Sequence, residues 1–267
     1  MHTLRHPSAA VHPDRFCNGL LAAWPDAEWT VLAPELEWVS LDQGQLLYEA
    51  GAPLRHVYFP ATAVVSLVST LRSGASVEVA MVGHEGMVGV TAFMGAGTAY
   101  TSAIVQAPGQ AWRLSAPTLG QHVRRSEPVL QVMLGYTQAL LSHMAQTSAC
   151  HCHHGLDQQL CRWLLLHLDR QDHDQVRSTQ ERIAAMLGVR REGVTGGALK
   201  LQKAGLIRYM RGRIDVLDRA GLEALSCECY AIVKDVYDRL RGQQPPPRTC
   251  AVEQTPGAPS QMLGATC

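Results

Sequence analysis

The sequence predicts an α+β fold in which an N-terminal antiparallel β-roll is followed by a long helix and a C-terminal winged helix-turn-helix. Three observations support this prediction. Short β-branched runs fill residues 37–114, an apolar heptad pattern runs through a helical stretch that starts near residue 126, and residues 178–213 combine two helical patterns with a basic hairpin. A chain of 267 residues exceeds the usual size of one domain, so two separate cores are expected.

The N-terminal residues carry no apolar core of a secretion signal, and no segment offers about eighteen consecutive apolar residues. We therefore expect a cytoplasmic protein without a membrane span. Residues 1–25 are expected to form a flexible tail. A short helix is predicted between residues 26 and 36, with Trp29 and Leu32 facing inward.

Residues 26–125 are expected to form a sensor domain, because their short predicted strands follow the pattern of an antiparallel β-roll. Alternating or β-branched runs predict strands at residues 37–41, 45–48, 56–59, 64–69, 76–81, 102–105 and 111–113. Gly-, Pro- and Asp-containing breakers separate these runs. The stretch RSGA at residues 72–75 predicts a hairpin turn.

A long helix is predicted to begin at residues 126–128, where proline is tolerated because the first amide groups of a helix lack partners. Residues 126–154 are expected to form a dimerisation helix and hinge. The predicted dimerisation seam has alternating three- and four-residue steps and consists of Leu130, Met133, Thr137, Leu140 and Met144. A second apolar stripe contains Val129, Val132, Tyr136 and Ala139. We expect one stripe to pack on the roll and the other to pair with a second copy; the alternative is that one domain buries both.

The end of this helix carries the stretch CHCHH at residues 150–154, and thiolate and imidazole groups bind zinc or copper. Successive residues on a helix point about 100° apart, so adjacent side chains cannot all converge on one ion. Only Cys150 with His153 or His154 have face-sharing spacing. We interpret the stretch as a polar helix end and expect no metal site and no cofactor; metal or redox sensing is the alternative. Cys227 and Cys229 are interpreted as structural thiols.

Residues 155–240 are expected to form a winged-helix domain, followed by a Pro/Gly-rich tail at residues 241–267. A helix at residues 156–167 leads into it. Ser178 and Glu181 have capping-box spacing, and Gly188 suits a sharp turn before a second helix that is predicted to open at Val189. The inward stripe predicted for this second helix consists of Val194, Ala198 and Leu201. Residues 206–210 and 214–217 predict the strands of a wing, and residues 218–237 a closing helical segment.

Charge is concentrated on this module although the chain is neutral overall. Residues 177–213 hold nine basic residues against two acidic ones, a net charge of +7, whereas residues 1–120 carry a net charge of −4. A local cationic surplus is typical of phosphate binding. A solvated helix face is the usual alternative, but the coincidence with a helix-turn-helix pattern favours double-stranded DNA as the partner.

These segments resemble the Crp/Fnr family of transcription regulators, the catabolite-activator type with a cyclic-nucleotide-binding-like β-roll and a winged helix-turn-helix. The resemblance covers roughly residues 35–240 and is carried by LCRWLL at 160–165, TQERIA at 179–184, LGVRREGVT at 187–195 and LQKAGLI at 201–207. It implies a homodimer that binds pseudo-palindromic promoter sites and contacts RNA polymerase. An enzyme is not expected, since no Ser-His-Asp, Walker or zinc-protease motif appears.

Base contacts are assigned to the start of the second helix. Arg191 can donate two parallel hydrogen bonds to guanine, and Glu192 can accept one from a cytosine amino group. The resemblance adds Arg190 and Thr195 as neighbouring contacts. The phosphate-binding candidates are Arg182, Lys200, Arg211 and Arg213, and Thr179 completes the predicted DNA-binding set. Gly196 and Gly197 stand where relatives often carry longer polar residues, so the family's target sequence does not transfer.

The sensor's ligand is not named by the sequence. Nucleotide-binding relatives use a Gly-Glu pair for the ribose and an Arg-Ser pair for the cyclic phosphate. The corresponding candidate pocket here consists of Gly86, Gly89, Val90, Thr101 and Ser102, without the acidic or the arginine partner. Because burying a phosphate without a countercharge is costly, we expect no response to ordinary cyclic AMP. The alternative function is a small-ligand or redox/metal sensing module whose basic domain contacts a protein.

Overall fold

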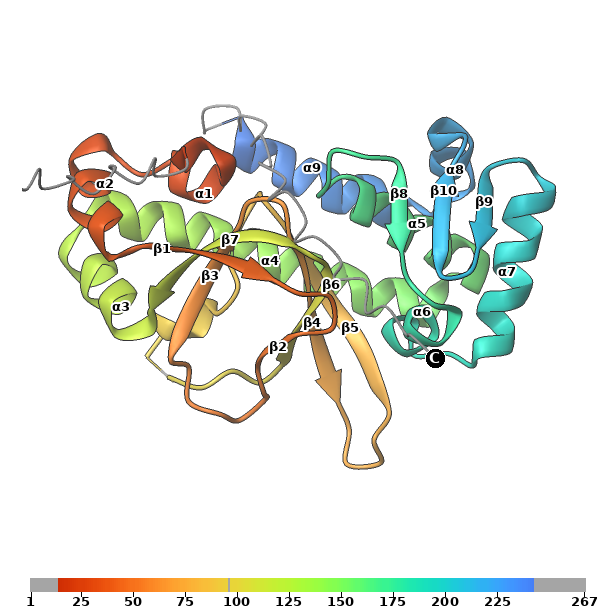
Figure 1. Cartoon of the computed structure of the whole chain (residues 1–267), viewed down its shortest axis with the longest axis horizontal. Helices are drawn as coiled ribbons and strands as arrows, with labels where there is room; N and C mark the ends of the chain where they lie inside the picture. Colours follow the sequence, from red (N-terminus) through yellow and green to blue (C-terminus); the bar gives the residue numbers. More distant parts are fainter. Residues whose placement is uncertain (1–13, 96, 243–267) are drawn as a thin grey trace, which may run out of the picture.

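The computed structural model describes residues 14–95 and 97–242, and its N-terminal half is a β-roll (Figure 1). The seven strands are β1 (Glu37–Leu41), β2 (Leu46–Tyr48), β3 (His56–Pro60), β4 (Val64–Thr70), β5 (Ser76–Val82), β6 (Ser102–Ala107) and β7 (Gly109–Ser115). They form two antiparallel sheets, with the orders β1-β7-β3 and β2-β6-β4-β5. All seven predicted strands are confirmed, as is the turn between β4 and β5, because short β-branched runs between breakers have few other ways to bury their side chains.

The predicted flexible tail at residues 1–25 is wrong for its described part. Residues 15–25 contain η1 (Arg15–Cys17) and α1 (Gly19–Ala22) and are packed against the roll. Asn18 is fully buried, and its amide donates to the carbonyls of Pro60 and Gly86, each at 2.8 Å. The segment is too short for a periodic signal, so tertiary contacts decide its structure. Residues 1–13 and 243–267, to which the remainder of the tail predictions applies, lie outside the described residues.

Two helices follow the N-terminal segment, and two others follow the roll. The predicted short helix is α2 (Asp26–Leu32), continued by η2 (Ala33–Glu35), and it buries Leu32 as expected. The helix α3 (Ala116–Arg125), capped by Ser115, was not predicted. The long helix α4 (Glu127–His153) begins after Ser126, whose hydroxyl accepts from the Val129 amide, with Pro128 in the first turn as predicted.

The predicted dimerisation seam on α4 is largely buried within the same chain. Met133, Thr137 and Leu140 are buried, and Leu130 and Met144 are half-buried. The alternative, in which one chain buries both stripes, describes this structure. The physical reason is that α4 packs against β5 on one side and against a second long helix of the chain, α9, on another.

The C-terminal module has the predicted winged-helix topology. It contains α5 (Leu156–Leu168), β8 (Gln175–Arg177), α6 (Gln180–Leu187), α7 (Arg191–Lys203), β9 (Ile207–Met210), β10 (Arg213–Val216) and α8 (Arg219–Leu225). The three strands form a sheet with the order β8-β10-β9. Strand β8 was not predicted.

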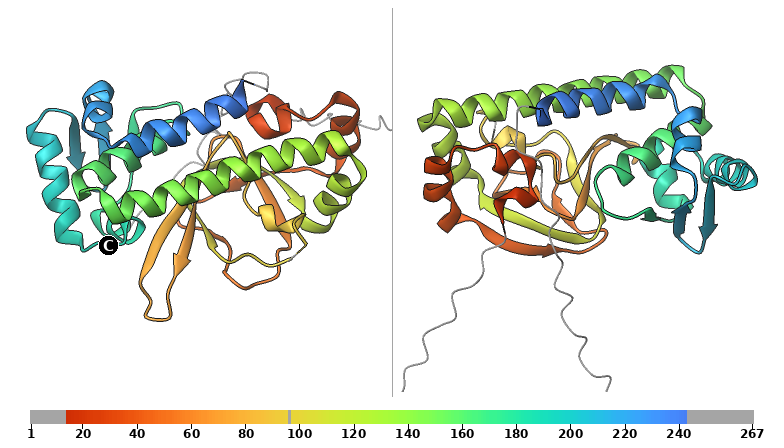
Figure 2. Two further views of the ribbon diagram at one scale, coloured as in Figure 1. Left: turned by 180° about the vertical axis from the view of Figure 1, so that it is seen from behind. Right: turned by 90° about the horizontal axis from the view of Figure 1, so that it is seen from above.

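The predicted closing helical segment at residues 218–237 consists of two helices. The second, α9 (Glu228–Arg241), leaves the winged-helix module and runs back beside α4, as Figures 1 and 2 show from three directions. Buried side chains of the roll, α4, the module and α9 form one continuous cluster, where two separate cores were predicted. Helix α9 and the contact of α6 with β5 join the cores. Within the described ranges, none of the helices combines the length and apolar character that a bilayer span requires.

Candidate nucleic-acid interface

The helix-turn-helix begins at α6, and its cap differs from the prediction. The Thr179 hydroxyl accepts a hydrogen bond from the Arg182 amide at 3.2 Å, so Thr179 is the N-cap residue. Ser178, the predicted cap, is buried one residue earlier. The turn after α6 is as predicted, because Gly188 has a φ of 65°, in the left-handed region that favours glycine.

Helix α7 begins at Arg191, two residues after the predicted start, with Arg190 as its N-cap residue. Its predicted inward stripe is confirmed, since Val194, Ala198 and Leu201 are all buried. Two glycines that the sequence left unexplained allow α7 to approach α5 closely. A Cβ atom at Gly193 would lie 2.7 Å from Leu156, and one at Gly197 would lie 3.1 Å from Asp157.

The opposite face at the start of α7 is exposed and carries Arg190, Arg191 and Glu192. Within residues 14–95 and 97–242, neither arginine side chain has a hydrogen-bond or ion-pair partner. Thr195 is half-buried, and its hydroxyl donates to the Gln180 side chain at 2.7 Å. Thr195 therefore holds α6 against α7, and the two arginines are the groups of this face that are free to bind a ligand.

The phosphate-binding candidates are distributed over three elements. On the wing, Arg211 is exposed in the left-handed conformation (φ 42°) beside Gly212, while Arg213 forms a bidentate ion pair with Asp215, with distances of 2.8 and 2.9 Å. That hydrogen bond lowers the pKa of Asp215 and raises that of Arg213. On α7, Lys200 contacts Asp157 of α5 at 2.7 Å. Exposed pairs of this kind contribute little to stability because water screens them, so a phosphate can displace the carboxylate.

Helix α6 and strand β8 adjoin the roll on one side, while Glu181 of α6 is exposed. The Gln43 amide donates to the carbonyls of Gln106, at 2.8 Å, and Arg177, at 2.7 Å, and the Gln106 amide lies 3.2 Å from the Met186 sulfur. Half-buried Arg182 extends toward Gly44 of the roll. Helix α7 and β9 lie at the end of the molecule far from α3 (Figure 1), whereas the turn before α7 adjoins the roll, since a Cβ atom at Gly188 would lie 3.4 Å from Val77 of β5.

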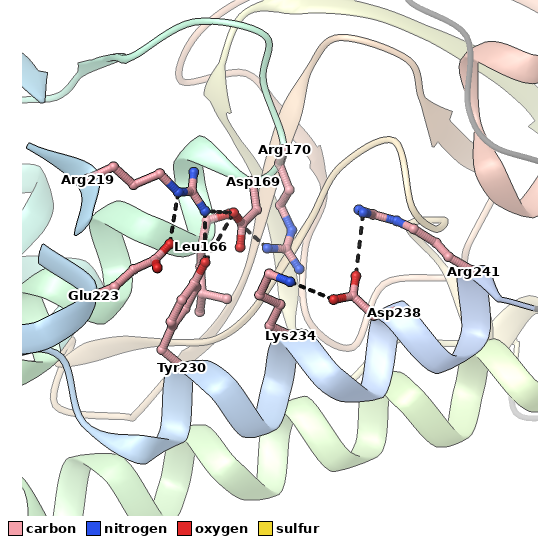
Figure 3. A network of polar contacts seen from close by, with 9 residues as sticks. All are labelled: Leu166, Asp169, Arg170, Arg219, Glu223, Tyr230, Lys234, Asp238 and Arg241. Atoms are coloured by element: carbon pink, nitrogen blue, oxygen red, sulfur yellow. Dashed lines mark hydrogen bonds and ion pairs between the residues drawn. The ribbon is translucent and has the colours of Figure 1, made fainter.

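A polar network fixes the other side of the module to α9 (Figure 3). The guanidinium of Arg219 contacts the carboxylates of Asp169 and Glu223 and donates to the Tyr230 hydroxyl at 2.8 Å. Tyr230 in turn donates to Asp169 at 3.3 Å. The start of α8, the end of α5 and the first turn of α9 therefore share one set of charge-assisted hydrogen bonds.

The candidate effector residues have different environments. A Cβ atom at Gly86 would lie 2.1 Å from the Tyr136 ring, so the space beside this glycine is filled by α4. Gly89 is left-handed (φ 100°) and precedes η3 (Val90–Ala92). The Ser102 hydroxyl, at the start of β6, accepts from the Ala50 amide at 3.1 Å, and Thr101 precedes it. Gly86 therefore has a packing role here.

Four side chains with metal-binding groups converge where α4 meets α9, and the pattern of residues 150–154 alone does not predict this grouping. The side chains of Cys150, His154, Cys227 and Cys229 converge, with all four ligand atoms within 4.8 Å of one another. No metal site was expected because the side chains of residues 150–154 alone cannot surround an ion. The other two ligands, Cys227 and Cys229, come from the start of α9. The signal available in sequence was a second closely spaced pair of cysteines, at 227 and 229.

Two family models match the chain in order. The model of the cyclic nucleotide-binding domain matches residues 38–126, and that of the Crp-like helix-turn-helix domain matches residues 158–225. A comparison with proteins of curated function found no match.

Solved structures share the overall fold. A Crp/Fnr-family protein from Eubacterium rectale is 18% identical, with a TM-score of 0.62, and the match covers 76% of this chain and 94% of that one. FixK2 from Bradyrhizobium japonicum is 16% identical, with a TM-score of 0.60 and coverage of 72% and 98%. The regulator TTHA1359 from Thermus thermophilus is 22% identical, with a TM-score of 0.58 and coverage of 71% and 98%. The chain therefore carries a cyclic nucleotide-binding domain followed by a Crp-like helix-turn-helix domain, the arrangement of a Crp/Fnr-type DNA-binding transcription regulator.

Proposed function

We propose that the protein regulates transcription as a homodimer that reads a pseudo-palindromic promoter site, with α7 of each copy in a major groove. The observation that carries the proposal is the exposed start of α7, where Arg190 and Arg191 have no partner among the described residues and Glu192 lies beside them. Arg191 would donate to guanine, Glu192 would accept from cytosine, and Arg190 would contact the neighbouring base or backbone. The net charge of +7 over residues 177–213 supports phosphate binding around them.

Arg211 is the first candidate for a phosphate contact, because it is exposed on the wing and has no partner among the described residues. Arg213 and Lys200 would exchange their carboxylate partners for phosphates. Thr179 and Arg182 would contribute from α6. Thr195 would support the interface indirectly by holding α6 against α7.

Dimerisation is proposed to use a face of α4 other than the predicted seam. Leu134 and Leu141 are 46% and 59% exposed, and the two residues are seven positions apart, on one stripe of the helix. Small or polar residues occupy the intervening and following positions of that stripe, at Gln138, Ala145 and Ser148. A two-fold dimer through this stripe suits a regulator whose site contains two half-sites.

The effector is proposed to be something other than ordinary cyclic AMP. The stretches that correspond to the Gly-Glu and Arg-Ser pairs of the family's nucleotide-binding members read GMVGV at residues 86–90 and YTS at residues 100–102, without an acidic residue or an arginine. The Ser102 hydroxyl is already hydrogen-bonded to Ala50. A cyclic phosphate would therefore lack the expected countercharge and hydroxyl partner.

The domain division that we propose follows these roles. The sensor occupies residues 14–125, the long helix and hinge residues 126–154, and the winged-helix module residues 155–225, with α9 as a return helix on α4. Contact with RNA polymerase is proposed from the resemblance to the Crp/Fnr family, as is a location in the cytoplasm.

The proposal is tested by selecting bound fragments from genomic DNA with the purified full-length chain, followed by band-shift titrations on the enriched sequence. We expect a site with two half-sites about 10 base pairs apart, bound at least 1,000-fold more tightly than random DNA. Eight phosphate contacts per dimer would give a salt slope of about −7. Added cyclic AMP should leave the affinity unchanged. Equal affinity for all sequences, together with capture of a protein partner, would instead support the alternative of a sensor that acts through protein contacts.

A further inference from the structure

Four metal-ligand side chains from two distant parts of the chain meet where the winged-helix module joins the long helix. Cys150 and His154 lie at the C-terminal end of α4, while Cys227 and Cys229 lie at the start of α9. The Sγ atoms of Cys150 and Cys227 are 3.5 Å apart, and the Sγ atom of Cys229 is 3.4 Å from Nδ1 of His154. All four ligand atoms lie within 4.8 Å of one another.

These distances fit a four-coordinate ion. Zinc binds thiolate sulfur at about 2.3 Å and imidazole nitrogen at about 2.0–2.1 Å, which places the ligand atoms of a tetrahedron roughly 3.5–3.8 Å apart. A disulfide would require about 2.05 Å between two sulfur atoms and would leave the other two ligands unused. Three sulfurs and one nitrogen in tetrahedral reach are the ligand set that zinc prefers.

The burial pattern separates this group from ordinary core cysteines. Cys150, Cys227 and Cys229 are free thiols and form a buried cluster of their own, apart from the continuous apolar core. Cys161 on α5, in contrast, is buried within that core, and Cys152 on α4 is exposed. Thiols that serve only as small apolar side chains pack into the apolar core and need no imidazole nitrogen beside them.

A second group of contacts orients the ligands. Nε2 of His154 lies 3.3 Å from the Glu228 carboxylate, so the nitrogen turned away from the cysteines has the acceptor that zinc-binding histidines usually have. The Gln146 amide donates to the Cys229 sulfur at 3.0 Å. The buried Arg162 guanidinium interacts electrostatically with Cys150 and is hydrogen-bonded to Thr147. A zinc ion with three thiolates and a neutral imidazole has a net charge of −1, which Arg162 would balance.

We propose that Cys150, His154, Cys227 and Cys229 bind one structural zinc ion that fastens the start of α9 to the end of α4. Cys150 and Cys227 are 77 positions apart in sequence, and the winged-helix module is the segment between them. The ion would therefore close the base of the DNA-binding module. Closing so long a loop restricts the unfolded chain and limits the motion of the module relative to α4.

The test measures the metal content of the full-length chain, purified under reducing conditions, by mass spectrometry of the elements. We expect about one zinc per chain. The Cys227→Ser and Cys229→Ser variants should retain less than a tenth of it, whereas Cys152→Ser, on the same helix but exposed, should retain all of it. Substitution with Co²⁺ should give the visible bands of a tetrahedral thiolate site. Equal zinc in wild type and Cys229→Ser, or a wild type that binds no zinc when titrated, overturns the proposal, as does peptide mapping that finds a Cys150–Cys227 disulfide in the reduced preparation.

A variant that keeps all four ligands separates metal binding from folding. Glu228→Gln should fold normally, retain the Co²⁺ bands and lower the zinc affinity about 10-fold, because the carboxylate orients His154. Chelation of the wild type should expose the segment between α8 and α9 to limited proteolysis, and added zinc should restore its protection. A Glu228→Gln affinity equal to that of wild type, or proteolysis that is indifferent to chelation, counts against the site.

Discussion

The Glu85 carboxylate and the Arg170 guanidinium form a buried ion pair, with 2.7 Å between Oε1 and Nε. Glu85 belongs to the loop after β5 in the sensor, and Arg170 follows α5 in the winged-helix module. Arg170 also donates to the Leu166 carbonyl at 2.8 Å and lies over the Tyr237 ring of α9. Burial by itself raises the pKa of Glu85, but the attraction of Arg170 and His84 outweighs it and leaves the pKa below its ordinary value. One charge pair therefore joins the sensor, the module and α9.

Removing one charge of this pair should strongly lower the free energy of unfolding. The Glu85→Gln variant leaves Arg170 buried without a countercharge, and we expect it to lower the free energy of unfolding by about 3–5 kcal/mol. The double variant with Arg170→Met should recover much of that loss. Urea unfolding at neutral pH measures both. The control is Glu37→Gln, which removes the exposed partner of Arg113 and should leave the free energy of unfolding nearly unchanged. If the losses of unfolding free energy in the single variants Glu85→Gln and Arg170→Met added up to the loss in the double variant, the two residues would not be coupled.

The buried carboxyl group of Glu78 should make the stability of the fold depend on pH. Glu78 of β5 accepts from the Ser66 hydroxyl, and burial raises its pKa to about 7 against the opposing effects of Ser66 and Arg162. The unfolded chain releases this proton near pH 4.5 and the folded chain near pH 7, so this group destabilises the fold progressively across that window. Glu78→Gln should gain about 3 kcal/mol relative to wild type between pH 4.5 and pH 8. Chemical denaturation in a pH series measures this gain, and a difference that does not change with pH contradicts it.

Local patterns made the strands, the turn at Gly188 and the inward stripe of α7 predictable, because each depends on neighbours within a few residues. The cap of α6 was wrong by one residue, since Ser178 and Thr179 are both good capping residues and tertiary packing buries the first. The return of α9 to α4 joins segments about 80 positions apart, and no periodicity encodes such a pairing. The same return brings Cys227 and Cys229 beside Cys150 and His154.

The assignment of base readout to Arg191 can be separated from phosphate binding. Arg191→Ala should weaken the cognate site by about 1–3 kcal/mol and relax the preference at one base pair of each half-site. Arg211→Ala, on the exposed wing, should instead weaken all sequences by a similar factor and reduce the salt slope by about one per protomer. Fluorescence anisotropy on cognate and scrambled duplexes measures both. If Arg191→Ala weakened the two duplexes equally, Arg191 would be a phosphate contact.

If the exposed stripe of α4 forms the dimer interface, substitutions on this stripe should change the mass in solution, and substitutions in the buried seam beside it should change only the stability. Leu134→Lys and Leu141→Lys each place a charge on the exposed stripe and should convert the dimer to a folded monomer that binds half-sites weakly. The matched control is Val31→Lys, which introduces the same charge at an apolar residue of α2 that is 61% exposed, and it should remain dimeric. Met133→Ala, within the buried seam, should instead lower the free energy of unfolding by about 2–5 kcal/mol without changing the mass in solution. Light scattering after size-exclusion chromatography gives the masses. A Leu141→Lys variant that stayed dimeric at micromolar concentration would exclude this stripe as the interface, because two buried lysines facing each other across a two-fold axis repel.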